Sequence, residues 1–146
     1  MARILRQLST MLCVGLLACG DPLGPLLDVA SVELQFDLIT ERCAEDVAAR
    51  QHVVEGHEGR ISLSGVYMTA NGGWELTPIV AAPTRGEILV TVQGSWANAG
   101  LAIPICHLYE IGLSEIPTGT YEVKLVHSDV TFDTSQTVSH TRVRVR

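Results

Sequence analysis

The sequence has little positive charge, few aromatic residues and, beyond its first 18 positions, no long hydrophobic run. Its 146 residues include 10 Lys and Arg against 16 Asp and Glu, and 5% are aromatic. A chain with this acidic balance does not attract nucleic acid or anionic lipid by charge. A membrane-spanning helix needs roughly 20 consecutive apolar residues. We therefore expect neither a nucleic-acid-binding protein nor a membrane-spanning one.

The common catalytic motifs are also missing. Gly94-Ser95-Trp96 lacks the later Gly of a hydrolase nucleophile turn, and His57-Glu58 is not followed by the second His of a zinc-protease helix. Glycine patterns that cradle nucleotide phosphates are absent as well. We therefore expect no cofactor and no enzymatic activity.

The N-terminal segment has the order of a secretory signal. Arg3 and Arg6 accompany a short apolar run that ends at Ala18, and the run is too short to span a bilayer. Its last residues, Leu16-Leu17-Ala18-Cys19, resemble the lipobox of bacterial lipoproteins. The resemblance implies that signal peptidase II cuts after Ala18 and that Cys19 carries lipid, including palmitate. The alternative is an ordinary secretory signal cut elsewhere, with Cys19 as a spare thiol.

Lipoprotein processing would divide the chain into three parts. Residues 1–18 are the signal peptide, residues 19–28 are the lipidated Cys and a tether rich in Gly and Pro, and residues 29–146 form one domain. In bacterial lipoproteins, Asp directly after the lipidated Cys favours retention in the inner membrane, and Gly20 stands there instead. The resemblance therefore implies a cell-envelope protein held to the outer membrane by its lipid.

Two cysteines remain for the mature domain. Cys13 leaves with the signal and Cys19 is acylated, so Cys43 and Cys106 form an even pair in an oxidising compartment. We predict that they form a disulfide. The alternative is a metal site of two Cys with the adjacent His107, although the chain has no CxxC spacing.

From position 28 onward, apolar residues alternate with polar ones, which is the period of half-buried β-strands. Turn residues separate the strands, and no βαβ alternation is present. The pattern predicts an antiparallel β-sandwich of about seven strands. The expected strands are Val32–Leu38, Ile61–Tyr67, Trp74–Thr77, Gly86–Gln93, Ile103–Leu113, Thr120–His127 and Thr137–Val145.

Two connections have distinctive sequences. Asn71-Gly72 lies between two of the alternating runs and predicts a tight β-hairpin, because both residues tolerate positive φ. Glu41 to Val54 contains Ala44, Ala48 and Ala49, and we expect a helical turn within it.

The segment Ile116–Val123 resembles the penultimate-strand motif of immunoglobulin-like and fibronectin-like domains. In those families a Tyr hydroxyl bonds back to an upstream backbone group, and Tyr121 is the matching position. The resemblance implies an immunoglobulin-like sandwich. Cys106 precedes Tyr121 by fifteen residues, outside the family's spacing, so the resemblance extends to architecture and not to membership of the true immunoglobulin family.

The histidines are the candidate ligands for a metal site. His127 and His140 lie on the last two expected strands, where they could face each other and bind zinc or copper with His107 nearby. The alternative is that each is a surface or edge residue. A histidine cluster of this kind would make the chain a small periplasmic metal-binding protein or enzyme.

The long loop from Gly94 to Ala102 carries Trp96 and Asn98, and binding residues are common on such loops. The alternative is that Trp96 folds back over the end of the core. We expect a non-catalytic binding or structural module, whose partner is an envelope protein or a surface glycan reached through loops or an accessible edge strand.

Overall fold

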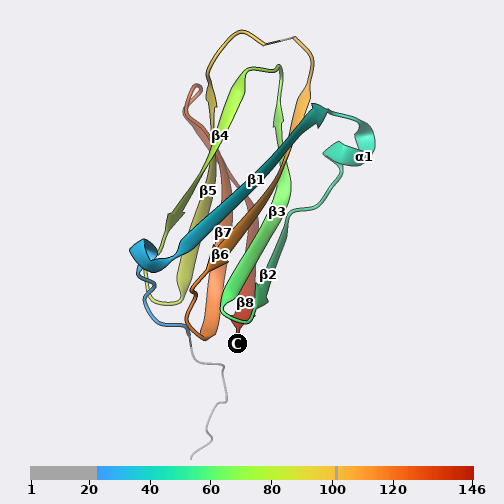
Figure 1. The fold of residues 1–146 in the computed structure, drawn as a ribbon. Coiled ribbons are helices and arrows are strands. Elements are labelled where there is room, and N and C mark those ends of the chain that lie inside the picture. The colour runs from blue at the N-terminus through green and yellow to red at the C-terminus, as the bar shows by residue number, and fades with distance from the viewer. Residues whose placement is uncertain (1–22, 101) are drawn as a thin grey trace, which may run out of the picture.

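Alternating apolar residues give each strand one side that must be buried, and the chain buries these sides between two facing β-sheets. The structure is a computed structural model that describes residues 23–100 and 102–146. One sheet has the strand order β1-β6-β3-β2 and the other has the order β4-β5-β7-β8 (Figure 1). The strands are β1 (Glu33–Arg42), β2 (Val53–His57), β3 (Arg60–Thr69), β4 (Trp74–Ala81), β5 (Glu87–Trp96), β6 (Ile105–Ser114), β7 (Gly119–Asp129) and β8 (Thr134–Val145).

The expected all-β sandwich is confirmed, with β2 as a strand that the sequence pattern did not predict. All strand pairs are antiparallel except β5 with β7, which run parallel. The parallel pair arises because the chain leaves the sheet after β5, forms β6 in the opposite sheet, and returns as β7.

The core lies between the sheets, where inward side chains of the central strands are buried. Ile88, Val90 and Val92 were expected on one face of their strand, and each is at most 1% exposed. Burying one such side chain stabilises the fold by about 1.5–3 kcal/mol. The other strands contribute a matching set, which includes Ile61, Leu63, Tyr109, Ile111, Leu113, Tyr121, Val123, Leu125 and Val145.

The hairpin expected at Asn71-Gly72 is wrong. β3 already pairs with β2 and β6, and β4 pairs with β5 in the other sheet. The connection therefore crosses from one sheet to the other instead of folding back. The preferred two-residue hairpin turn needs positive φ at both central residues, whereas the positive φ in this connection, 87°, belongs to Gly73.

The predicted disulfide is confirmed. Cys43 and Cys106 are bonded, with their Cα atoms 4.9 Å apart and a sequence separation of 63. The bond lies on the outer face of the first sheet, where the helical turn α1 (Glu45–Ala48) covers it. Val47 of α1 packs there against Val66 and Cys106 in a second, smaller core. The helical turn expected between Glu41 and Val54 is thus present, and β2 is the next element along the chain.

Tyr121 has the contact that the immunoglobulin-like motif implied. Its hydroxyl donates a 2.7 Å hydrogen bond to the carbonyl oxygen of Pro117, four residues upstream. The side chain is fully buried, and its ring packs against Gly24, where any side chain would collide with it.

The domain begins earlier than the predicted boundary at residue 29. The amide of Gly24 donates to the carbonyl of Thr120 at 2.7 Å, and Leu27 is 5% exposed within the main core. Residues 23–28 therefore belong to the domain and not to a tether, because Leu27 supplies part of the buried surface. Cys19 and the expected signal peptide lie outside the described residues.

The two ends of the sandwich differ. Connections 70–73 and 130–133, together with residues 97–100 and 102–104, gather at the upper end in Figure 1, which we call the distal end. Leu23 bridges Thr120 at the start of β7, and the C-terminal strand ends beside it, at the proximal end (Figure 1). No helix in the described ranges is long and apolar enough to cross a membrane.

Candidate binding cleft at the distal end

A cleft of about 650 Å³ opens between the two sheets toward the distal end. β2 lies beside β8 only from Val53 onward, and His52, the residue directly before it, borders the cleft. The other walls come from β3, from the end of β7 and from the first half of β8. The cleft therefore exists because the shortest strand leaves one side of the sandwich uncovered.

His127 forms the inner wall of the cleft. Its Nε2 shares a 2.8 Å hydrogen bond with the hydroxyl of Tyr109, which reaches across from the other sheet. Its ring lies 5.0 Å from the ring of His52 in an edge-on arrangement and 4.8 Å from the ring of Tyr67, measured between centroids. Four rings from four parts of the chain, the residue before β2 and the strands β3, β6 and β7, thus meet at one point.

The protonation of this cluster follows from its burial. Burial lowers the pKa of His127 to about 4, and repulsion from His52 adds to the lowering. Burial raises the pKa of Tyr109, and burial together with the nearby Asp129 raises the pKa of Tyr67 to about 12. At neutral pH His127 is therefore a neutral imidazole and the phenols of Tyr67 and Tyr109 are protonated, while Asp129 also lines the cleft.

Two backbone contacts hold the cluster in place. His52 Nε2 lies 3.3 Å from the carbonyl oxygen of Val66, and the Tyr67 hydroxyl donates to the carbonyl of Ser128 at 3.0 Å. Each side chain is thus tied to a strand other than its own. Most of the cleft wall is built on strands, and His52, Ala70 and Phe132 complete it from the connections. This strand framework favours a preformed binding site.

Aromatic residues continue from the cleft onto the distal surface. Trp74 and Phe132 line the cleft with ring centroids 6.3 Å apart, and Trp74 pairs in register with Trp96 on the neighbouring strand. Trp96, Val130 and Phe132 are 53%, 54% and 69% exposed. We call these three residues the distal patch. Exposed apolar groups that cluster in this way mark interaction sites more often than chance.

The predicted binding loop is part of this surface. Trp96 does not fold back over the end of the core, because more than half of its side chain remains exposed. The amides of Ala97 and Asn98 both donate to the carbonyl of Gly73, at 2.9 and 3.1 Å. A side chain at Gly73 would collide with the backbone of Asn98. The loop is therefore pinned to the β3–β4 connection, which presents Trp96 outward.

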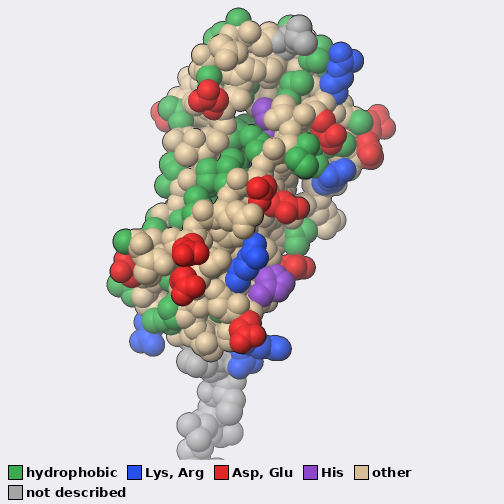
Figure 2. Space-filling model, in the orientation of Figure 1, with side chains coloured by type: hydrophobic (Ala, Val, Ile, Leu, Met, Phe, Trp, Pro, Cys, Tyr) green, Lys and Arg blue, Asp and Glu red, His purple; other side chains and the backbone are tan. Residues whose placement is uncertain are grey.

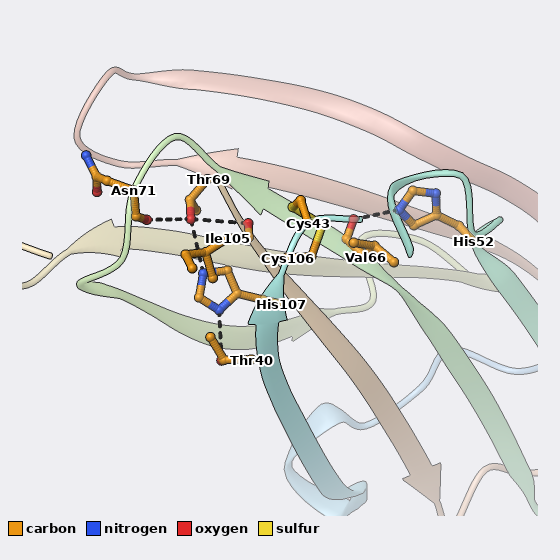
Figure 3. Close-up of a disulfide and its surroundings, with 9 residues drawn as sticks. All are labelled: Thr40, Cys43, His52, Val66, Thr69, Asn71, Ile105, Cys106 and His107. Carbon is orange, nitrogen blue, oxygen red and sulfur yellow. Dashed lines mark hydrogen bonds between the residues drawn. A yellow bond between two sulfur atoms is a disulfide. The ribbon is translucent and has the colours of Figure 1, made fainter. Parts of the chain in front are cut away.

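The structure places the three candidate metal ligands in separate environments. His107 is buried between Thr40 and Thr69, whose hydroxyl oxygens lie 3.1 and 3.2 Å from its two ring nitrogens (Figure 3). His140 lies on the outer face of the second sheet, with Nε2 3.2 Å from a carboxylate oxygen of Glu122. His127 points inward. Within residues 23–100 and 102–146, no three His, Cys, Asp or Glu side chains are placed to hold a metal ion.

A second exposed feature is the edge strand β1, which pairs only with β6 among the described strands. Leu34 and Leu38 point toward the other sheet but remain 44% and 40% exposed. Figure 2 shows hydrophobic side chains gathered in the upper half of this face, in the region where β1 and β4 pass. The facing edge strand β4 carries Pro78, which lacks an amide for strand pairing.

Sequence reasoning identified His127 and Trp96 but missed most of the cleft. His52 fell in a segment with no clear period, whereas Tyr67 and Tyr109 fitted the strand pattern and carried no sign of a site. Phe132 had a usable signal, since it is an aromatic residue in a turn between Asp129 and Asp133. The convergence of these residues depends on the pairing of strands far apart in sequence.

Taken together, the fold and this cleft define the chain as a β-sandwich domain with an exposed aromatic surface at one end. No protein-family model matches the chain, and searches among curated proteins and solved structures also returned no match.

Proposed function

We propose that the chain is a lipid-anchored, non-catalytic recognition module of the bacterial cell envelope. Lipid on Cys19 attaches it to the outer membrane, and the distal cleft and distal patch bind an envelope partner. The observation that carries the proposal is the placement of these two features. The chain reaches the domain at Leu23, at the proximal end, and the aromatic surface lies at the opposite end.

Distances support this orientation. Four residue steps separate Cys19 from Leu23, and a fully extended chain covers about 3.5 Å per residue, so the proximal end stays within about 14 Å of the lipid. β7 has 11 residues, which at about 3.3 Å per residue gives a length near 36 Å. The distal patch is thereby presented well away from the anchoring membrane.

The anchoring half is tested by the chemistry of the mature N-terminus. We expect mass spectrometry of the native protein to find an acylated Cys19 as the first residue. The variant Cys19→Ser should leave the membrane fraction, whereas Cys13→Ser, a matched change inside the signal, should remain in it. An unmodified N-terminus on the native protein would overturn this half.

The recognition half is tested by photo-crosslinking in cells. A photoreactive phenylalanine at Trp96 should give higher-mass adducts, and the same residue at Thr84, which is exposed at the proximal end, should not. Adducts of equal yield at both positions would contradict recognition at the distal end.

A further inference from the structure

We infer that the partner of the distal surface is a protein, which docks an apolar segment carrying Lys or Arg onto Trp96, Val130 and Phe132. The inference rests on the proposed recognition function and names the class of its partner. Four features of the surface support it: its apolar character, its rigidity, its charge and the adjoining cleft.

The distal patch is apolar over two neighbouring loops. In the segment from Trp96 to Gly100, the side-chain hydrogen-bonding groups are the amide of Asn98 and the indole N–H of Trp96. The amide of Trp96 donates to the Thr131 hydroxyl at 3.2 Å, so the β5–β6 loop and the β7–β8 hairpin lie side by side. Among Trp96, Val130 and Phe132 the one hydrogen-bonding group is the indole N–H, whereas a glycan needs many paired hydrogen bonds to replace its water. An apolar protein segment gains free energy by displacing water from these three side chains.

The surface is also preorganised. One carboxylate oxygen of Asp129 accepts hydrogen bonds from the amides of Thr131 and Phe132, at 2.9 and 3.1 Å, and the amide of Val130 donates to the carbonyl of Gly94 at 3.0 Å. The hairpin that presents Phe132 is therefore held in one conformation. Little conformational entropy is lost on docking to such a surface.

The charge around the patch is acidic. Residues 94–100 and 129–134, which form the two loops, contain no Lys or Arg, while Asp129 and Asp133 flank Phe132. Glu75 pairs in register with Ser95, beside the first loop. A basic partner is attracted to this border, and an anionic lipid surface is repelled from it.

The adjoining cleft can take a long cationic side chain. Trp74, Phe132 and Asp129 all line it. The methylene stem of a Lys or Arg from the partner would cover the aromatic rings while its charge meets the carboxylate of Asp129. The aromatic surface and the carboxylate together select a basic residue within an apolar segment.

Purified mature protein and synthetic peptides test the inference directly. Titration with a short peptide of alternating Leu and Lys should change tryptophan fluorescence, and the matching peptide of Leu and Glu should not. Phe132→Ser should weaken binding of the Leu–Lys peptide at least tenfold. The matched control Ile39→Ser, at a side chain that is 66% exposed on β1, should leave it unchanged.

A separate variant tests the acidic residues around the distal patch. Asp133 has a positive φ of 50°, which Asn also tolerates, so Asp133→Asn combined with Glu75→Gln should lower the affinity for the Leu–Lys peptide severalfold and reduce its salt dependence. Equal binding of both peptides, or binding that Phe132→Ser leaves intact, would overturn the inference. Stronger binding to vesicles of phosphatidylglycerol than to the peptide would also overturn it. If the peptide titration fails but crosslinked adducts form at position 96 in cells, the inferred partner class is rejected and the proposed recognition function is retained.

Discussion

The hydroxyl of Tyr109 in β6 and Nε2 of His127 in β7 lie 2.8 Å apart and join the two sheets through a hydrogen bond. The surrounding core disfavours an imidazolium ion, so this hydrogen bond is made by the neutral form of His127. It links the packing of the sandwich to the chemistry of the cleft, since His127 also forms the cleft wall.

The first prediction concerns acid stability. In the unfolded chain His127 is protonated near pH 6.5, but in the folded protein its pKa is about 4. The unfolded state therefore binds more protons between these values, and the free energy of unfolding should fall by about 2–3 kcal/mol as the pH drops through this window. Urea unfolding at a series of pH values measures the change.

The matched variants for this experiment are His127→Gln and His140→Gln. The first should remove most of the decrease, and the second should keep it, since His140 is on the outer face. Because burial lowers the pKa of His107 as well, a smaller decrease should remain in His127→Gln. An unchanged pH dependence in His127→Gln would contradict the role given to the Tyr109–His127 pair.

A second prediction concerns the disulfide. The bond between Cys43 and Cys106 spans 63 positions, and the chain-entropy account assigns roughly 4 kcal/mol to a loop of this length. Reduction should lower the free energy of unfolding by up to that amount. The double variant Cys43→Ala with Cys106→Ala should match the reduced protein and show no further response to reductant. A change below about 1 kcal/mol would show that the loop constraint contributes little.

A third prediction concerns Tyr121. Tyr121→Phe removes the hydroxyl that donates to Pro117 and keeps the ring, so it should lower the free energy of unfolding by about 1–1.5 kcal/mol. Ser31→Ala serves as a control, since the Ser31 hydroxyl also donates to a backbone carbonyl, that of Asp28 at 2.8 Å, but is exposed. Denaturant unfolding should find little change for Ser31→Ala. Equal effects of the two substitutions would mean that burial of the Tyr121 bond is unimportant.

A fourth prediction addresses the alternative function as a metal-binding protein. Because His107, His127 and His140 lie in separate environments, we expect no binding of zinc or copper at micromolar concentration to the mature protein. Isothermal titration measures this directly. Saturable binding of one ion, abolished by His127→Ala, would instead support a metal site built around His127.

His127 and His140 do not face each other, for a specific reason. The last two strands do pair, as expected, but the register puts Lys124 opposite His140 and Gln136 opposite His127. Lys124 and His127 are three residues apart on β7, and side chains alternate between the two faces of a strand. His140, opposite Lys124, therefore lies on the outer face, while His127 points into the sandwich.

The amino-acid sequence by itself determined every described strand except β2, the disulfide and the Tyr121 contact. These follow from local alternation, from the count of cysteines and from a short motif in which the hydroxyl bonds only four residues upstream. Tertiary structure alone decided which strands pair, where the domain begins and that His52, Tyr67, Tyr109 and His127 meet. The physical reason is that each strand has two edges and many equivalent partners, and the choice among them is made by burial of the complete core. β3 therefore joins β6 instead of the adjacent β4, and the cleft forms beside His52, directly before β2 begins.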